Sequence, residues 1–377
     1  MGMEDLSVKQ IISFTLILAL LIYVYPHKEK VYAKPSVSAQ NAVLMEQSTG
    51  RVLFEKQGHE KKKIASITKV MTAIIAIESG KMKEEVTISR RAVYEEGSSI
   101  YLEQGEKMKL KDLVYGLMLR SGNDAATAIA EHVGGSVEGF AVLMNEKASW
   151  LGMTNTHFTN PHGLDEEEHY STAYDMALLT QYAMENETFR KISKTTLHKA
   201  DSRTYAWGNK NKMLTKYYEH STGGKTGYTK VAGRTLISTA NKEGMELIVV
   251  TLNAPDDWND HQYLFEWGYD NYDLRKLQQE GRVPMDFSES GEALGYIWDD
   301  VVFPLTNEEA NSVQKTTHID KPDPLGVEAS VLGKLSFNVN GEILTEVSIM
   351  ADPKPIRSPF WKTSRTIFER LMGGSNG

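Results

Sequence analysis

The sequence predicts an α+β fold, with one large layered domain of strands and helices followed by a small all-β domain. Strand patterns stand at the beginning and the end of residues 34–275, and helix patterns lie between them. Over residues 276–352 strand patterns dominate. Residues 1–33 and 353–377 are expected to lie outside both domains.

The elements of the large domain follow from turn residues and hydrophobic spacing. Two apolar runs flank a polar turn at 47–50 and predict a hairpin, and residues 66–79 combine helical spacing with a stop at Gly80. A later helix ends before two glycines, and the last two strands are joined by a polar link that ends in glycine. The predicted elements are strands at 42–45 and 51–54, helices at 66–79, 111–119, 124–133 and 172–186, and strands at 233–240 and 245–253.

The small domain is predicted from alternating apolar residues. Leu335, Phe337 and Val339 share one face of a strand, and three apolar residues share a face of the next strand: Ile343, Val347 and Ile349. Both sets have odd residue numbers, so the apolar residues of the two strands can lie opposite each other only if the loop between the strands has an odd number of residues. We expect a three-residue loop at 340–342 with a bulge.

The composition excludes several function classes. Hydrophobic residues make up 41% and charged residues 24%, so the chain is expected to be globular. A net charge of -8 without a long basic run gives no general attraction to nucleic acid. There is no cysteine, and His157 and His162 lack the spacing of a metal motif. We therefore expect no metal and no other cofactor, and assign these histidines to loops or the core.

The N-terminus predicts export. Residues 11–25 are almost entirely apolar and follow Lys9, which matches the core of a signal peptide and is short for a membrane-spanning helix. Val31 and Ala33 have the spacing of a cleavage site after Ala33, and Val37-Ser38-Ala39 is a second choice. An uncleaved anchor is the alternative, and it would place the rest of the chain in the same compartment.

Ser66 and Lys69 are the first candidates for chemistry. A spacing of three places both side chains on one face of the first helical turn, where the amine could take the proton of the hydroxyl. The amine can do so only if burial and neighbouring positive charge lower its pKa. Ser66 could instead be a simple helix cap. The same spacing recurs at Ser312 and Lys315, where a solvated loop is expected.

Two further polar clusters follow. Ser121 and Asn123 lie in a tight link between two predicted helices, where such residues most often form turns. The run Lys225-Thr226-Gly227 occurs once and precedes a strand pattern, so we expect it at a turn that enters a strand.

The three clusters in this order resemble the penicillin-recognising serine acyltransferases, whose motifs are S-x-x-K, S-x-N and K-T-G. More narrowly, the chain is similar to low-molecular-mass penicillin-binding proteins of the D-Ala-D-Ala carboxypeptidase type, peptidase family S11, and most of all to the sporulation-associated enzymes of Bacillus-like bacteria. The resemblance covers about residues 36–350. The sequences at 64–73, 121–126, 160–164 and 171–177 are typical of this group. It implies the penicillin-binding transpeptidase fold, an antiparallel sheet with helices.

The resemblance also implies roles. Ser66 would attack the carbonyl between two terminal D-alanines of a peptidoglycan stem peptide, and Lys69 would accept its proton. Asn123 would hold Lys69 and the substrate amide. Ser121 and Lys225 would pass a proton to the departing D-alanine. β-Lactams would act as inhibitors, because they present an acylating carbonyl and a carboxylate in the same way.

Substrate binding is implied for the third cluster. Thr226, backed by the charge of Lys225, would bind the terminal carboxylate, and Gly227 would let the substrate lie against the strand. The backbone N–H groups of Ser66 and Tyr228 would form the oxyanion hole. Many relatives add an arginine near 256–261, where this chain has none. Arg234 could replace it or be a surface residue.

Two alternative functions remain, and a third is excluded. A β-lactamase would share the motifs, and Glu166, Glu167 and Glu168 resemble the glutamate that aims its water, although we expect them to be solvated. A catalytically silent penicillin sensor or wall-binding protein would also share them. A phosphate-binding loop around Lys225 is excluded, because Glu219 stands where its first glycine is required.

The last segment is amphipathic. Apolar residues of 360–372 cluster on one helical face, which predicts a helix in the membrane interface. Packing of this helix on its own domain is the alternative. Together these observations predict an exported enzyme associated with the cell wall or membrane.

Overall fold

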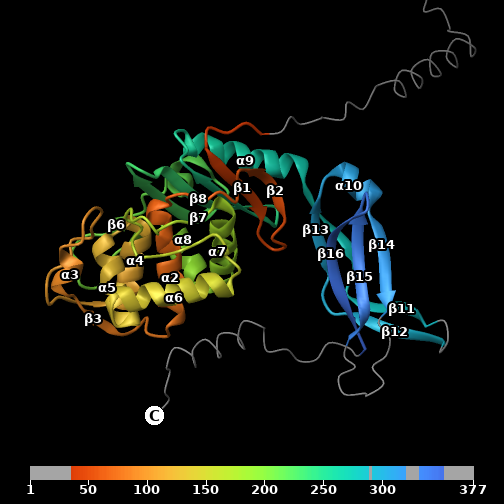
Figure 1. The fold of residues 1–377 in the computed structure, drawn as a ribbon, viewed down its shortest axis with the longest axis horizontal. Coiled ribbons are helices and arrows are strands. Elements are labelled where there is room, and N and C mark those ends of the chain that lie inside the picture. Colours follow the sequence, from red (N-terminus) through yellow and green to blue (C-terminus); the bar gives the residue numbers. More distant parts are fainter. Residues whose placement is uncertain (1–34, 288–290, 320–330, 352–377) are drawn as a thin grey trace, which may run out of the picture. The chain divides into compact units, whose positions relative to one another are not determined.

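The computed structural model describes residues 35–287, 291–319 and 331–351 (Figure 1). The predicted signal peptide and the predicted interfacial helix at 360–372 lie outside these residues. Within the described ranges, no helix has the length and apolar character needed to cross a membrane.

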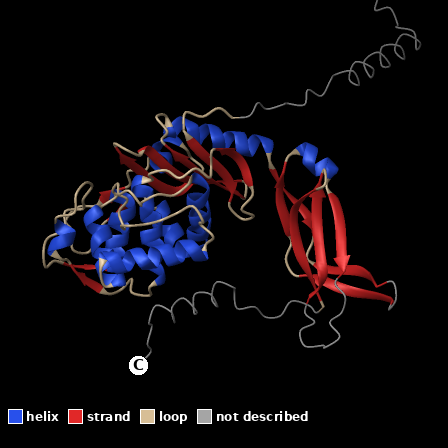
Figure 2. Cartoon of the chain, in the orientation of Figure 1, coloured by secondary structure: helices blue, strands red, loops and turns tan. Residues whose placement is uncertain are grey.

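A five-stranded antiparallel sheet organises the first part of the chain (Figures 1 and 2). Its order is β2-β1-β9-β8-β7, so β1 pairs with β9. The sequence predicted strands at both ends of residues 34–275, and the structure places them in one sheet. Strand β7 forms one edge. The bounds are β1 Asn41–Glu46, β2 Val52–Lys56, β7 Ser221–Thr229, β8 Gly233–Lys242 and β9 Met245–Leu252.

Helices cover both faces of this sheet (Figure 2). Val43, Met45 and Val250 pack against the group around α2, and the alternate residues Leu44 and Val249 pack against α9. The helices are α2 Lys69–Glu78, α3 Arg90–Val93, α4 Leu110–Arg120, α5 Asn123–Gly134, α6 Val137–Trp150, α7 Ala173–Glu185, α8 Glu187–Lys194 and α9 Asp257–Asn271. Shorter pieces are η1 Ala65–Thr68, η2 Met213–Tyr217, β3 Glu85–Thr87, β4 Lys107–Lys109, β5 Leu197–His198 and β6 Trp207–Gly208.

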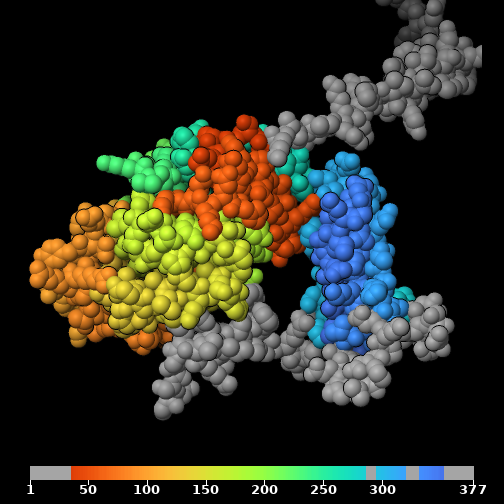
Figure 3. Space-filling view, viewed as in Figure 1, coloured from red at the N-terminus to blue at the C-terminus, as the bar shows by residue number. Residues whose placement is uncertain are grey.

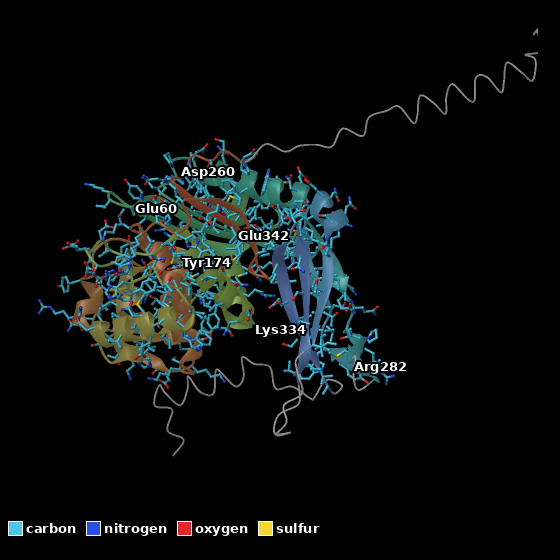
Figure 4. The ribbon with its side chains drawn as sticks, turned by 45° about the vertical axis from the view of Figure 1, so that its right-hand side comes forward. Glu60, Tyr174, Asp260, Arg282, Lys334 and Glu342 are labelled. Carbon is cyan, nitrogen blue, oxygen red and sulfur yellow. The ribbon has the colours of Figure 1, made fainter. Side chains whose placement is uncertain are left out.

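Helix α2 is the centre of the helical layer. Every residue from Lys69 to Ile77 is buried, as expected of a helix that is apolar on all sides. The N-terminal strands lie directly against the segment that contains α7 (Figure 3). At the other face, the carboxylate of Asp260 on α9 accepts hydrogen bonds from Ser38 and Ala39 (Figure 4).

The later strands pair with one another among the described residues. β10 Asp273–Gln278 pairs with β13 Val301–Leu305, and a second five-stranded sheet has the order β11-β12-β16-β15-β14. Lys334 and Glu342 in Figure 4 mark β15 and β16. The remaining bounds are β11 Gly281–Phe287, β12 Gly291–Ile297, β14 Gln314–Ile319, β15 Val331–Val339, β16 Glu342–Met350 and α10 Asn307–Ser312.

The predicted three-residue loop between the last two strands is wrong. Val339 pairs with Glu342, so the turn has two residues, and the register shifts further down, between Phe337 and Asn338. Because this bulge changes the alternation, Ile343 is 61% exposed, whereas Ile349 is buried.

Candidate active site

Ser66 lies in η1, immediately before α2. Its Oγ is 2.8 Å from Nζ of Lys69, the first residue of α2. Ile64 and Thr68 occupy the cap positions of η1 and α2, and neither side chain makes a capping hydrogen bond. The cap role that the sequence also allowed for Ser66 is therefore not what the structure shows, and the hydroxyl faces the lysine amine.

The Lys69 amine is surrounded by three oxygen atoms. Besides Ser66 Oγ, it is 2.7 Å from Asn123 Oδ1 and 2.6 Å from the His162 carbonyl oxygen. A carbonyl oxygen can only accept a hydrogen bond, so these two partners take both N–H groups of a neutral amine. The remaining lone pair then points to the Ser66 hydroxyl. The site thus orients a base toward the serine proton.

The surroundings of Lys69 favour the neutral amine. Its side chain is fully buried, and burial lowers its pKa well below the ordinary value. The positive charges of Lys225 and Lys210 lower this pKa further, and Asp124 and Glu95 oppose the shift. Lys69 therefore has the pKa lowered by burial and by neighbouring positive charge that the sequence analysis required of a base.

Ser121 and Asn123 are positioned by the tight turn between α4 and α5. Ser121 adopts a left-handed conformation with φ 63°, which ends α4 and lets α5 begin two residues later. Asn123 Nδ2 donates to the carbonyl oxygen of Glu96. This bond fixes the orientation of the amide, so its oxygen faces Lys69.

Lys225 forms the second amine of the site. Its Nζ donates to Ser121 Oγ at 3.0 Å and to the Thr226 carbonyl oxygen at 2.7 Å. Burial lowers the pKa of Lys225 to about 7, and the charge of Lys210 adds to the effect. The run Lys225-Thr226-Gly227 lies in the middle of β7 rather than at a turn that enters a strand, which corrects the sequence prediction.

Gly227 brings β7 against the serine turn. A Cβ at this position would lie 2.9 Å from the Ser66 backbone nitrogen and 2.4 Å from Thr235 Oγ1. Thr235 on β8 in turn donates to the carbonyl oxygen of Ile64, just before η1. Only glycine fits this approach, which places the edge strand beside the Ser66 backbone.

A loop at 160–163 also contacts the start of α2, and the sequence analysis assigned no role to it. Thr72 on α2 donates to the Pro161 carbonyl oxygen at 2.6 Å, next to the bond from Lys69 to His162. Gly163 has φ 86°, and a Cβ there would lie 2.0 Å from the Ala65 carbonyl oxygen. Proline and glycine predict a turn here, but sequence carries no signal for what a backbone carbonyl will face.

The remaining predicted residues lie along β7 and β8. Thr226 is half-buried, and Tyr228 is 66% exposed at the cross-strand position opposite Arg234. Arg234 Nη2 donates to the Asp257 carboxylate, and its guanidinium lies over the ring of Trp258. Its role toward a substrate stays a prediction. Glu166, Glu167 and Glu168 are exposed, as expected.

Comparisons with known proteins agree with this arrangement. The sequence model described as D-alanyl-D-alanine carboxypeptidase, Peptidase_S11, matches residues 28–256. D-alanyl-D-alanine carboxypeptidase DacF of Bacillus subtilis is 33% identical over 355 residues, which are 89% of each chain. DacC of Escherichia coli is 36% identical over 267 residues, 64% of each chain.

Solved structures have the same fold. The structure of penicillin binding protein 5 from Haemophilus influenzae aligns with a TM-score of 0.75 at 26% identity, over 86% of this chain and 99% of that one. The fold is therefore a penicillin-binding transpeptidase domain, an antiparallel sheet with helices, followed by β-sheet structure, as the resemblance implied.

Proposed function

This chain belongs to the D-alanyl-D-alanine carboxypeptidase family, peptidase S11, and we propose that it removes the terminal D-alanine from peptidoglycan stem peptides through an acyl-enzyme on Ser66. The observation that supports this most directly is the buried Lys69 amine, whose two fixed acceptors leave its lone pair toward Ser66 Oγ. No metal and no cofactor takes part.

Acylation begins with the Ser66 proton. Lys69 Nζ accepts this proton while Oγ attacks the carbonyl carbon between the two D-alanines. The carbonyl oxygen becomes negative and is held by the N–H groups of Ser66 and Tyr228, each worth about 3 kcal/mol by analogy with other oxyanion holes. The C–N bond then breaks. Ser121, in contact with Lys225, delivers a proton to the departing nitrogen, and D-alanine leaves.

Deacylation uses the same base. Before deacylation, Lys69 gives up to solvent the proton that it took from Ser66, and Lys225 regains from solvent the proton that it supplied through Ser121. Water then attacks the ester carbonyl, Lys69 accepts a proton from that water and passes it to Ser66 Oγ, which is released as a hydroxyl. The shortened peptide then dissociates. The cycle consumes one water and returns every side chain to its starting state.

Strand β7 supplies the binding surface. It is an edge strand, so its outer backbone groups pair with no described strand. Side chains already bond to Gly223 and Gly224, so an extended peptide would lie along the part of the strand that follows them. Gly227 permits this close approach, and Thr226 with Lys225 contacts the terminal carboxylate. Arg234 is a second candidate for the carboxylate.

The proposed setting is outside the cytoplasm, in the cell wall or the spore cortex. The predicted signal peptide supports export, and the D-alanyl-D-alanine carboxypeptidase name of the relatives supports a wall substrate. β-Lactams are the expected inhibitors, and nucleic acid is not a partner.

The test is D-alanine release from a synthetic acyl-D-Ala-D-Ala peptide. We expect steady release by the unmodified chain and none by Ser66→Ala. Ser312→Ala is the matched control, because Ser312 precedes Lys315 with the same spacing but donates only to backbone carbonyls of α10. It should keep full activity.

Two outcomes would overturn the proposal. Rapid turnover of benzylpenicillin without D-alanine release would identify a β-lactamase. A stable penicillin adduct without D-alanine release would identify a sensor.

A further inference from the structure

Glu95 contacts the elements that carry both oxygen acceptors of the Lys69 amine. It lies in the connection that follows α3 (Figure 1), and its side chain is 18% exposed. Oε2 of its carboxylate accepts the Thr127 hydroxyl at 2.8 Å, and Oε1 is 3.4 Å from His162 Nε2. Each carboxylate oxygen therefore has a partner on a different element, and neither oxygen takes part in the proposed proton transfers.

Thr127 connects Glu95 with the helix that carries the first acceptor. Thr127 lies four residues after Asn123 on α5, so the two side chains share one face of the helix. Its side chain is fully buried, so its hydroxyl needs a hydrogen-bond partner, and the Glu95 carboxylate supplies one. The next residue contributes as well, because the Glu96 carbonyl oxygen accepts a hydrogen bond from the Asn123 amide. This short segment therefore holds the first acceptor of Lys69.

His162 connects Glu95 with the second acceptor. The His162 carbonyl oxygen is 2.6 Å from Lys69 Nζ, and the imidazole ring of the same residue is buried. Burial and the charge of Lys69 lower the pKa of His162 to about 3, so the ring is neutral near pH 7. The Leu164 N–H donates to Nδ1 at 3.3 Å, so the ring proton is on Nε2 and faces the Glu95 carboxylate.

We propose that Glu95 is a positioning residue, which holds the His162 ring and α5 at one carboxylate and so keeps both acceptors directed at Lys69. A carboxylate suits this task, because its two oxygens can accept from two directions. The acceptors must stay in place, since a misplacement of about 1 Å can cost about 100-fold in rate. This inference rests on the proposed function, in which Lys69 is the base.

The charge of Glu95 acts on the same amine in a second way. It raises the pKa of Lys69, as the charge of Asp124 does, whereas the charges of Lys225 and Lys210 lower this pKa. Glutamine in place of Glu95 keeps an oxygen acceptor for the histidine ring and removes the negative charge. Alanine removes both the acceptor and the charge. These two variants therefore separate the positioning effect from the electrostatic effect.

The test measures the rate constant of acylation by benzylpenicillin as a function of pH. Glu95→Ala should lower the maximal rate constant about tenfold or more, because the acceptors of Lys69 lose their support. Glu95→Gln should keep most of the maximal rate constant. Its rising limb should move to lower pH, because Lys69 loses its proton more readily without the neighbouring negative charge.

A double-mutant cycle tests whether the effect passes through the histidine ring. His162→Ala keeps the backbone carbonyl and removes the ring, so Glu95→Ala should cost less in this background than in the unmodified chain. Glu103→Ala and Glu103→Gln are the matched controls, because Glu103 is exposed in the same connection between α3 and β4. Both should keep the maximal rate constant and the rising limb. Urea denaturation confirms that each variant is folded under the assay conditions.

The proposal is overturned if Glu95→Ala acylates at the normal maximal rate, or if Glu95→Gln loses as much of this rate as Glu95→Ala. Additive losses in the cycle, or a rising limb that stays in place in Glu95→Gln, would also contradict it. D-Alanine release is measured alongside. If the unmodified chain released no D-alanine, the proposed function would fail, and acylation by benzylpenicillin would still decide the role of Glu95.

Discussion

At the scale of single residues, the site depends on two buried amines whose pKa values are both lowered and whose hydrogen-bond partners differ. Lys69 has two obligate acceptors and strong burial, which favour a neutral base. Lys225 has a pKa of about 7 and contacts the Ser121 hydroxyl, which suits a proton donor. Pairs of titratable groups whose environments differ in this way are typical of acid–base catalysis.

These lowered pKa values of Lys69 and Lys225 predict a bell-shaped dependence of kcat/KM on pH, provided that Lys69 loses its proton at a lower pH than Lys225. Activity rises with pH as Lys69 loses its proton, because only the neutral amine can act as the base. Activity falls above about pH 7, as Lys225 loses its charge. In Lys225→Arg the guanidinium stays charged, so the descending limb should move above pH 9, whatever the remaining rate, because an arginine pKa exceeds about 12.

Lys230→Arg is the control for this profile, because Lys230 is exposed just beyond the end of β7. It should keep the descending limb near pH 7. A limb that stays near pH 7 in Lys225→Arg would show that another group causes it.

Sequence spacing predicted the contacts of Ser66 with Lys69, because a helical turn fixes the distance between residues three apart. It could not predict the acceptor at His162, which is a backbone carbonyl from a distant loop.

At the scale of elements, the serine turn η1 is held between a loop and a strand. Gly163 touches it on one side and Gly227 on the other, each too close for a side chain. The position of Ser66 therefore depends on these contacts as much as on α2.

Gly163→Ala is predicted to displace the loop that supplies the His162 carbonyl. The new Cβ would lie 2.0 Å from the Ala65 carbonyl oxygen, so the loop or η1 must move. We expect the rate of acylation by benzylpenicillin to fall at least tenfold and unfolding free energy to fall by about 1–3 kcal/mol. Stopped-flow acylation and urea denaturation measure these effects.

Gly152→Ala separates the clash from backbone strain. Gly152 also has a positive φ, 74°, but its added Cβ would meet no atom within 4 Å. It should lose some stability and keep its acylation rate. Equal acylation by the two variants would contradict the role given to the 160–163 loop.

Several elements escaped prediction for identifiable reasons. Helix α6 contains Gly139 in its first turn, and α9 contains Gly268 and many aromatic residues, all of which weaken a helix pattern. Gly268 is tolerated because α9 packs closely on Leu44 and Leu247 of the sheet. Tertiary packing, rather than local preference, stabilises these helices.

At the scale of the whole molecule, the described core residues form separate clusters. Two clusters lie on the two faces of the first sheet, and a third is built around Leu335, Phe337 and Ile349 in the later strands. The order of strand and helix patterns along the sequence predicted the first sheet with its helices and the later strands. The predicted length of the last loop was wrong. A bulge within the strands also brings the odd-numbered apolar residues opposite each other, and odd numbering alone cannot tell whether the extra residue lies in the loop or in a strand.

Removal of the last segment should separate activity from membrane association. Every proposed catalytic residue lies between 66 and 225, so a chain ending at Asp352 should release D-alanine from a soluble peptide at an unchanged rate. It should no longer float with anionic lipid vesicles, because the amphipathic 360–372 stretch is gone. Retained vesicle binding after cleavage at Ala33 would assign membrane contact to another part of the chain.

The central claim is that one hydroxyl, activated by one buried amine, carries the covalent chemistry. The most direct measurement is peptide mapping by mass spectrometry after reaction with benzylpenicillin. A single penicilloyl adduct on the peptide containing Ser66, lost in Ser66→Ala and strongly slowed in Lys69→Met, is the predicted result. An adduct on any other residue, or normal acylation in Lys69→Met, would contradict it.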